Sequence, residues 1–176
     1  MGLEFVYIQE VLQGLREIEA PTTGSDLQQF LCAMNWMRTA LPNYSSMISP
    51  LHVLLEEVYG KAGGKRTNNA AAKIILSTVG WAEDHAACFR ACQEALEHIV
   101  TLVRVSHTKR ICMYTDASID FWSSITTQVP PKDFYLPPAE QRHEPLAFTS
   151  GAFTGAMSRW SIIEKDDFAK LASFER

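Results

Sequence analysis

The sequence predicts an α+β fold, in which a helical first part is followed by a three-stranded sheet with one helix. Up to about residue 105, apolar residues recur at the three- and four-residue spacing of a buried helix face. From Lys109 onward they fall in short runs of strand length separated by turn residues. This change of period predicts a helical region over residues 1–105 and a second domain over residues 106–176. A chain of 176 residues, 47% of them hydrophobic, suits one or two small domains.

Three helices are expected in the first part. Ser25 followed by Gln28 matches a capping box and predicts the start of the first helix. Ser49 as N-cap and Pro50 in the first turn predict the start of the second. The third is expected over about residues 84–100. Each of these segments has an apolar face, so the first hundred residues should be mainly helical.

Three strands and a final helix are expected in the second part. The β-branched and aromatic runs predict strands at residues 111–115, 122–127 and 145–149, and hairpin order favours antiparallel pairing. A long loop before the third strand is indicated by four prolines, Pro130, Pro131, Pro137 and Pro138. Ser158 is the expected N-cap of a closing helix.

Acidic residues stand at two positions that could meet in such a fold. Asp116 is the first carboxylate after the first strand, and Glu164 and Asp166 lie on the closing helix. Carboxylates on a strand end and a nearby helix can hold divalent metal for phosphodiester hydrolysis. Two structural explanations stay open: Asp116 can simply open a turn, and acids in a first helical turn are favoured by the helix dipole.

The order of these motifs carries a family resemblance. YTDAS, TQ, PLAF and WSIIEKDDFA resemble the ribonuclease H region in the Pol polyprotein of Ty3/gypsy-type retrotransposons, where it follows the reverse transcriptase. Upstream, the segment APTTGSDLQQFLCAMNWMRTALPNYSSMISPLHVLLEEVY is similar to the helical thumb and connection that end such a polymerase. The resemblance implies a reverse transcriptase thumb/connection region over residues 1–105 and a partial ribonuclease H-like domain over residues 106–176.

The resemblance also implies a chemistry for the acids. It makes Asp116 a metal ligand and catalytic residue on the first strand, and it places the second ligand at Asp166 on the helix. Glu164 is the fallback, because residues two apart on a helix point about 200° apart and cannot both face Asp116. The implied cofactor is Mg²⁺, and the implied reaction is hydrolysis of the RNA strand of RNA–DNA hybrids. The implied partners are such a hybrid, or other retroelement nucleic acid, and the remainder of the Pol polyprotein.

The sequence departs from the family in two ways. Asp166 stands where the family has glutamate, which reaches one methylene further. The family's other ribonuclease H aspartates would lie downstream and the polymerase acids upstream of these residues. We therefore expect a fragment of a longer polyprotein that is inactive in isolation. The alternative is a non-catalytic remnant that acts as a nucleic-acid-binding or protein-interaction module.

Charge restricts how the chain could bind nucleic acid. With 16 Lys and Arg against 20 Asp and Glu, the formal net charge is −4, so any such binding must be local. The best local candidates are Lys61, Lys65 and Arg66, in an acid-free segment over residues 60–73 that is rich in glycine and asparagine. An ordinary solvated loop explains this segment equally well. No apolar run approaches 18 residues, so we expect no membrane span and an intracellular protein.

Overall fold

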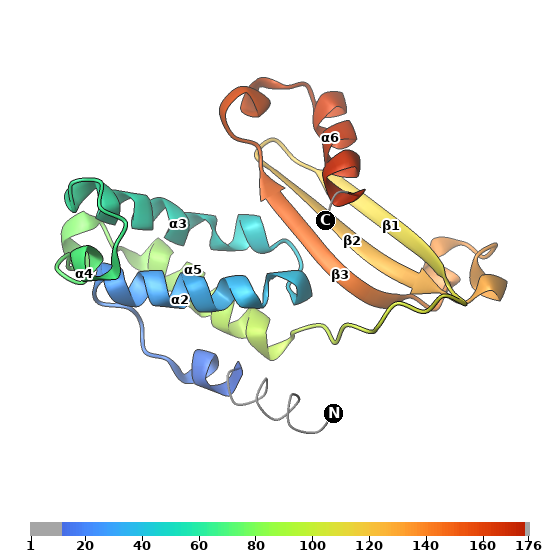
Figure 1. Ribbon diagram of the computed structural model, residues 1–176, viewed down its shortest axis with the longest axis horizontal. Helices are drawn as coiled ribbons and strands as arrows, with labels where there is room; N and C mark the ends of the chain where they lie inside the picture. Colours follow the sequence, from blue (N-terminus) through green and yellow to red (C-terminus); the bar gives the residue numbers. More distant parts are fainter. Residues whose placement is uncertain (1–11, 175–176) are drawn as a thin grey trace. The chain divides into compact units, whose positions relative to one another are not determined.

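The computed structural model describes residues 12–174 and has the expected α+β fold (Figure 1). The chain forms two compact units: the first comprises residues 1–37 and 47–99, and the second comprises residues 38–46 and 100–176. Each unit is described by itself. No helix in residues 12–174 combines the length and the apolar character needed to cross a membrane.

The first unit is helical. Residues 12–17 are helical, and the elements that follow are α2 (Gly24–Trp36), α3 (Tyr44–Lys61), α4 (Asn68–Ala71), a 3-10 turn (Leu76–Val79) and α5 (Glu83–Glu97). Their apolar faces meet in a core whose fully buried members include Leu27, Phe30, Met34, Leu51, Val58, Leu76 and Leu96. Phe30 of α2 packs against Phe89 of α5 with ring centroids 4.6 Å apart.

Two of the three predicted helix starts in this unit were wrong, whereas the third helix, expected from about residue 84, begins at Glu83. The N-cap of α2 is Thr23, whose hydroxyl accepts the Asp26 N–H while the Asp26 carboxylate accepts the Thr23 N–H. Ser25 is instead buried inside the helix and donates to the Asn68 side chain at 2.5 Å. Likewise, α3 starts at Tyr44 and carries the exposed Pro50 in its interior. The proline removes one backbone hydrogen bond, and the packing of this 18-residue helix tolerates that loss.

Close packing explains one glycine of the first unit. Gly24 opens α2, and a Cβ at this position would lie 2.3 Å from Cγ1 of Val58 and 2.9 Å from the Ala71 carbonyl oxygen. No side chain fits there without displacing α3. The glycine therefore sets how closely α2 approaches its neighbours.

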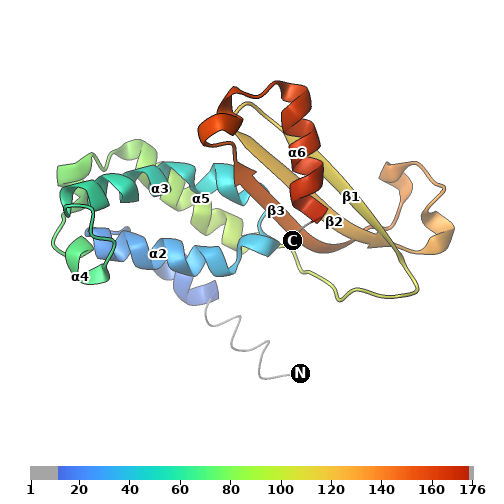
Figure 2. The ribbon, with the colours of Figure 1, turned by 45° about the horizontal axis from the view of Figure 1, so that its top comes forward.

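The second unit is an antiparallel sheet with one helix on one face (Figure 2). Its strands are β1 (Arg110–Ala117), β2 (Phe121–Val129) and β3 (Glu144–Ala152), in the order β1-β2-β3, with a register shift between Thr126 and Thr127. The three predicted strands and their antiparallel pairing are confirmed. The helix α6 (Ile162–Phe174) follows β3 and packs on β1 and β2. Three strands followed by a helix form the expected partial ribonuclease H-like fold.

The core of the second unit lies between the sheet and α6. Trp122, Phe153 and Ala169 are buried together, and Ala117 and Phe168 pack against them. The Trp122 ring meets Phe168 edge-on at a centroid distance of 6.2 Å. Gly151 leaves room for this ring, since a Cβ there would lie 2.5 Å from Nε1 of Trp122. This cluster decides which face of the sheet α6 covers.

The start of the last helix also differs from the prediction. Ser158 lies in a 3-10 turn over Gly155–Arg159, and α6 begins at Ile162. The residue that caps α6 is Ser161, whose hydroxyl faces the Glu164 N–H at 3.4 Å while the Glu164 carboxylate accepts the Ser161 N–H at 2.7 Å. Both serines precede the same apolar run, and only the reciprocal bond with Glu164 distinguishes them.

Candidate functional site

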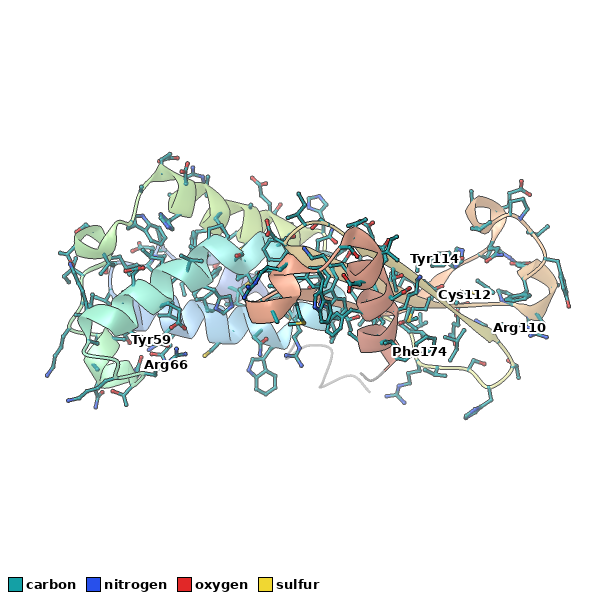
Figure 3. The ribbon with its side chains drawn as sticks, turned by 90° about the horizontal axis from the view of Figure 1, so that it is seen from above. Tyr59, Arg66, Arg110, Cys112, Tyr114 and Phe174 are labelled. Atoms are coloured by element: carbon teal, nitrogen blue, oxygen red, sulfur yellow. The ribbon has the colours of Figure 1, made fainter. Side chains whose placement is uncertain are left out.

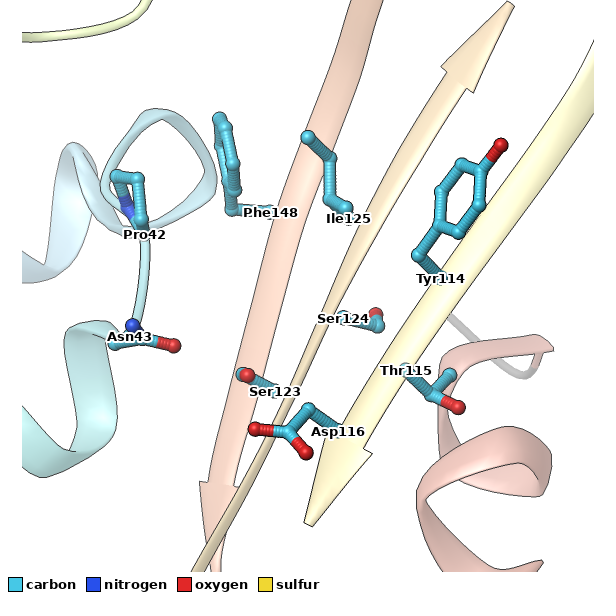
Figure 4. Close-up of a pocket in the computed structure, with 9 residues that line it drawn as sticks. All are labelled: Pro42, Asn43, Tyr114, Thr115, Asp116, Ser123, Ser124, Ile125 and Phe148. Carbon is cyan, nitrogen blue, oxygen red and sulfur yellow. The ribbon is translucent and has the colours of Figure 1, made fainter. Parts of the chain in front are cut away.

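Asp116 lies at the end of β1, as expected, on the sheet face that α6 does not cover. Its partner across the ladder is Ser123, while Ala117 pairs with Trp122. Ala117 and Trp122 both belong to the core beneath α6. Because neighbouring residues of a strand point to opposite faces, Asp116 points away from that core. Figure 4 shows the same alternation, with Thr115 on the side of α6 and Asp116 on the other side of β1.

Asp116 lines two small cavities on its own face of the sheet. One, of about 230 Å³, is bordered by Pro42, Asn43, Tyr114, Ser123 and Phe148 among others (Figure 4). The second, of about 180 Å³, is bordered by Asn43, Ser46, Ser118, Ser123 and Ser150 among others. Apart from Asp116, the residues lining both cavities are neutral. The carboxylate therefore sits in a serine-rich, uncharged environment rather than among other acids.

The acidic residues of α6, Glu164 and Asp166, do not lie beside Asp116. Glu164 is the capping-box acid of α6, and its carboxylate accepts both the Ser161 N–H and the Ser161 hydroxyl, at 2.7 and 2.8 Å. These bonds, the backbone one first, lower the pKa of Glu164 below its ordinary value. Asp166 is half-buried two residues further on. Neither residue lines the two cavities at Asp116.

Lys165, between the two helix acids, is a residue that the sequence did not single out. Its side chain is 3% exposed, and its ammonium donates to the carbonyl oxygens of Ile119 at 2.6 Å and Ser158 at 3.1 Å. The same ammonium lies 5.2 Å from the centre of the Phe153 ring. Lys165 thus ties α6 to the β1–β2 turn. A lysine flanked by acids normally indicates a solvated helix face, so no local signal could have revealed this burial.

Asp116, Asp166 and Glu164 do not by themselves complete the Mg²⁺ site that the resemblance implies. A pair of catalytic metal ions about 4 Å apart needs several converging carboxylates. Here Asp116 and α6 are on opposite faces of the sheet, and the Glu164 carboxylate is engaged by Ser161. Across residues 12–174, no three His, Cys, Asp or Glu side chains are grouped so that they could hold a metal ion.

The capping role of Glu164 makes a testable prediction. Because its pKa is lowered in the folded state, Glu164 stabilises α6 fully at pH values above its unfolded pKa. This contribution is lost as the pH falls through the lowered, folded value. We expect the Glu164 carboxyl, followed by side-chain NMR, to titrate below an ordinary glutamate and to return toward the ordinary value in Ser161→Ala. Ser158→Ala is the matched control and should leave the titration unchanged. An unshifted midpoint in the parent chain would contradict the capping box.

The three basic candidates surround the end of α3 and differ in their surroundings. Lys61 donates to the Thr78 carbonyl oxygen. Arg66 forms an ion pair with Glu56 at 2.7 Å and lies 5.2 Å from the centre of the Tyr59 ring (Figure 3). Lys65 is exposed and has no ion-pair partner among the described residues. The loop between them turns through Gly63 and Gly64, both at positive φ. All three cations are exposed.

Comparison with known proteins gives a likeness of fold. No family model matches the chain, and no curated protein matches it either. Among solved structures, foamy viral protease-reverse transcriptase in complex with dsDNA is similar with a TM-score of 0.70 and 20% identity, over 94% of this chain and 29% of that one. Its complex with RNA/DNA hybrid has a TM-score of 0.69 at 20% identity, over 94% and 19%. The dRH form with ds DNA has a TM-score of 0.69 at 20% identity, over 94% and 25%. The chain therefore shares the fold of a segment that makes up less than a third of these viral proteins.

Proposed function

We propose that this chain is an internal segment of the Pol polyprotein of a Ty3/gypsy-type retroelement and that it binds nucleic acid there. Its helical part would belong to the reverse transcriptase thumb and connection, and its sheet to a partial ribonuclease H-like domain. The observation that carries the proposal is the fold likeness to foamy viral protease-reverse transcriptase over 94% of this chain. The order of YTDAS, TQ, PLAF and WSIIEKDDFA along the sequence supports it independently.

The ligand we propose is an RNA–DNA hybrid or the related nucleic acid of the element. The viral proteins with this fold were solved with dsDNA and with RNA/DNA hybrid, which supports that choice. In this chain the contact would fall to Lys61, Lys65 and Arg66. Arg66 would exchange its exposed ion pair with Glu56 for a phosphate at little cost, because exposed ion pairs contribute little free energy. Lys61 would exchange its hydrogen bond to the Thr78 carbonyl oxygen for one to a phosphate.

Replacing Lys61, Lys65 and Arg66 together by alanine should weaken binding to a fluorescent RNA–DNA hybrid. In anisotropy titrations at several salt concentrations, the slope of log K against log salt should flatten by about one unit for each lost phosphate contact. Glu56→Gln should tighten binding, since it releases Arg66 from its ion pair. The control removes two other exposed, ion-paired cations, Arg90 and Lys170. Equal affinities and slopes for the triple variant and the parent would show that the segment is only a connector.

Catalysis is proposed for the longer parent and not for this chain alone. In the parent, an intracellular protein, Mg²⁺-dependent hydrolysis of RNA in hybrids would accompany reverse transcription. The remainder of the polyprotein would supply the missing acidic residues. A second candidate is a non-catalytic remnant that only binds nucleic acid or a protein. It is favoured by one observation, the separation of Asp116 from the acids of α6 by the sheet.

The isolated 176-residue chain should show no Mg²⁺-dependent cleavage of an RNA–DNA hybrid. The physical reason is that two-metal hydrolysis needs several carboxylates, and the described residues bring no such group together. A gel assay with labelled hybrid, with and without Mg²⁺, measures this. The matched control is Asp116→Asn, which should behave like the parent chain. Cleavage that disappears in Asp116→Asn would instead demonstrate an active centre within these residues.

A further inference from the structure

The loop between β2 and β3, residues 130–143, presents aromatic side chains to solvent. We call it the aromatic loop. It contains two short 3-10 turns, Pro131–Asp133 and Pro138–Glu140. Between them, Tyr135 is 84% exposed, and Phe134 and Leu136 are 39% and 41% exposed. Exposed apolar side chains that stand next to one another, rather than singly, can mark a binding surface.

The aromatic loop is held in shape by its own side chains. Asp133 is buried and accepts two bonds from the Arg142 guanidinium, at 2.6 and 2.9 Å. The Gln141 amide donates to the carbonyl oxygens of Phe134 and Leu136, at 3.3 and 2.8 Å. The Arg142 hydrogen bonds lower the pKa of the Asp133 carboxyl, so the pair stays charged at neutral pH. The backbone that carries the exposed rings is therefore held by these side-chain bonds, so ligand binding would cost little conformational entropy.

Two cations without an ion-pair partner among the described residues belong to the loop and to the neighbouring start of β1. Two acids at the base of the loop are paired, Asp133 with Arg142 and Glu144 with Lys109, while a third acid, Glu140, is exposed in the second 3-10 turn. Arg110 lies at the start of β1 (Figure 3). Its guanidinium is 4.9 Å from the centre of the Phe134 ring. Lys132 is exposed within the loop. Neither Arg110 nor Lys132 has an ion-pair partner among the described residues. Arg110 and Lys132 are thus available to an anionic ligand, although the chain as a whole has a net charge of −4.

We infer that the aromatic loop is a binding site for single-stranded nucleic acid, in which an unstacked base lies on the Tyr135 ring and neighbouring phosphates lie beside Arg110 and Lys132. Aromatic rings flanked by cations are the usual means of binding single strands, because every base has a face that can stack. A duplex does not offer this contact, since its bases are already stacked inside the helix. An apolar protein surface would gain nothing from the two cations. The inference rests on the proposed function only in taking the ligand to be a nucleic acid.

The test uses the full chain and two fluorescein-labelled probes of about 12 nucleotides, an oligothymidine and an abasic strand of the same length and charge. The parent should bind the oligothymidine more tightly than the abasic strand. Tyr135→Ala should weaken oligothymidine binding by about 5- to 150-fold, which corresponds to the loss of one stacked base. It should leave abasic binding unchanged. Tyr135→Phe, which keeps the ring, should keep the parent affinity, and Arg110→Ala should flatten the salt dependence for both probes.

Each other outcome overturns the inference. Equal affinity of Tyr135→Ala and the parent for the oligothymidine would exclude stacking on this ring. So would equal binding of both probes by the parent, or no binding of the oligothymidine at all. If Tyr135→Ala instead abolished only an association with another protein, the loop would be a protein interface. The result is independent of the hybrid assay, because that assay depends on Lys61, Lys65 and Arg66, at the end of α3. Far-UV circular dichroism checks that the exposed substitutions leave the fold intact.

Discussion

Replacing Trp122 with alanine is expected to destabilise the second unit by about 3–5 kcal/mol. Trp122 is 4% exposed, and its ring lies between the sheet and α6, against Phe168 and Gly151. Removing it deletes the largest side chain of the cluster with Phe153 and Ala169. The loss combines the transfer free energy of the indole with the cost of the cavity that remains. A whole domain is typically stable by only about 5–15 kcal/mol, so this change should leave the unit marginal.

Amide hydrogen exchange is the appropriate measurement, because peptides from β1, β2 and β3 report on this unit directly. Their protection should fall in Trp122→Ala by the same free energy. Tyr135→Ala is the matched control: it also truncates an aromatic residue, but one that is 84% exposed, and it should change protection little. If Trp122→Ala cost less than about 1 kcal/mol, the contact between α6 and the sheet would contribute little to stability.

The sheet could be predicted from the sequence, and the orientation of its acid could not. Apolar runs of strand length separated by prolines and turn residues specify three strands whatever surrounds them. They also place Asp116 at a strand end. Which face Asp116 occupies depends on the register that pairs Ala117 with Trp122 and on the face that α6 covers. Both are tertiary facts, since a shift of one residue would reverse every side chain of the strand.

The starts of α2, α3 and α6 were predicted wrongly for a different reason. Ser25 with Gln28 and Thr23 with Asp26 both match the capping pattern, and local sequence does not choose between them. In the structure the Ser25 hydroxyl is instead taken up by Asn68, 43 residues away, while Thr23 and Asp26 form the capping box. The closing helix is similar. Its apolar residues do not form one stripe, since Ile163, Leu171 and Phe174 are 71%, 65% and 77% exposed. Without a stripe, the sequence cannot show which residues face the sheet.

In the first unit, Phe30→Ala is expected to have the largest effect, about 3–5 kcal/mol of unfolding free energy. Phe30 is 1% exposed and meets the Phe89 ring at 4.6 Å, with the ring planes tilted by 49°. Its loss would remove the contact that joins α2 to α5 and leave a cavity lined by rigid helices, which cannot collapse fully. Hydrogen exchange in peptides from α2 and α5 should rise accordingly.

Trp36→Ala is the matched control for Phe30→Ala, because Trp36 lies on the same helix and is 83% exposed. It should change the protection of α2 by less than about 0.5 kcal/mol. Equal effects of the two substitutions would mean that α2 is stabilised by its own capping box and backbone bonds rather than by burial. A large effect of Phe30→Ala alone would establish that burial in this core stabilises α2. Because Gly24 of α2 packs closely against Val58 of α3, the same core then supports α3, near whose end Lys61, Lys65 and Arg66 lie.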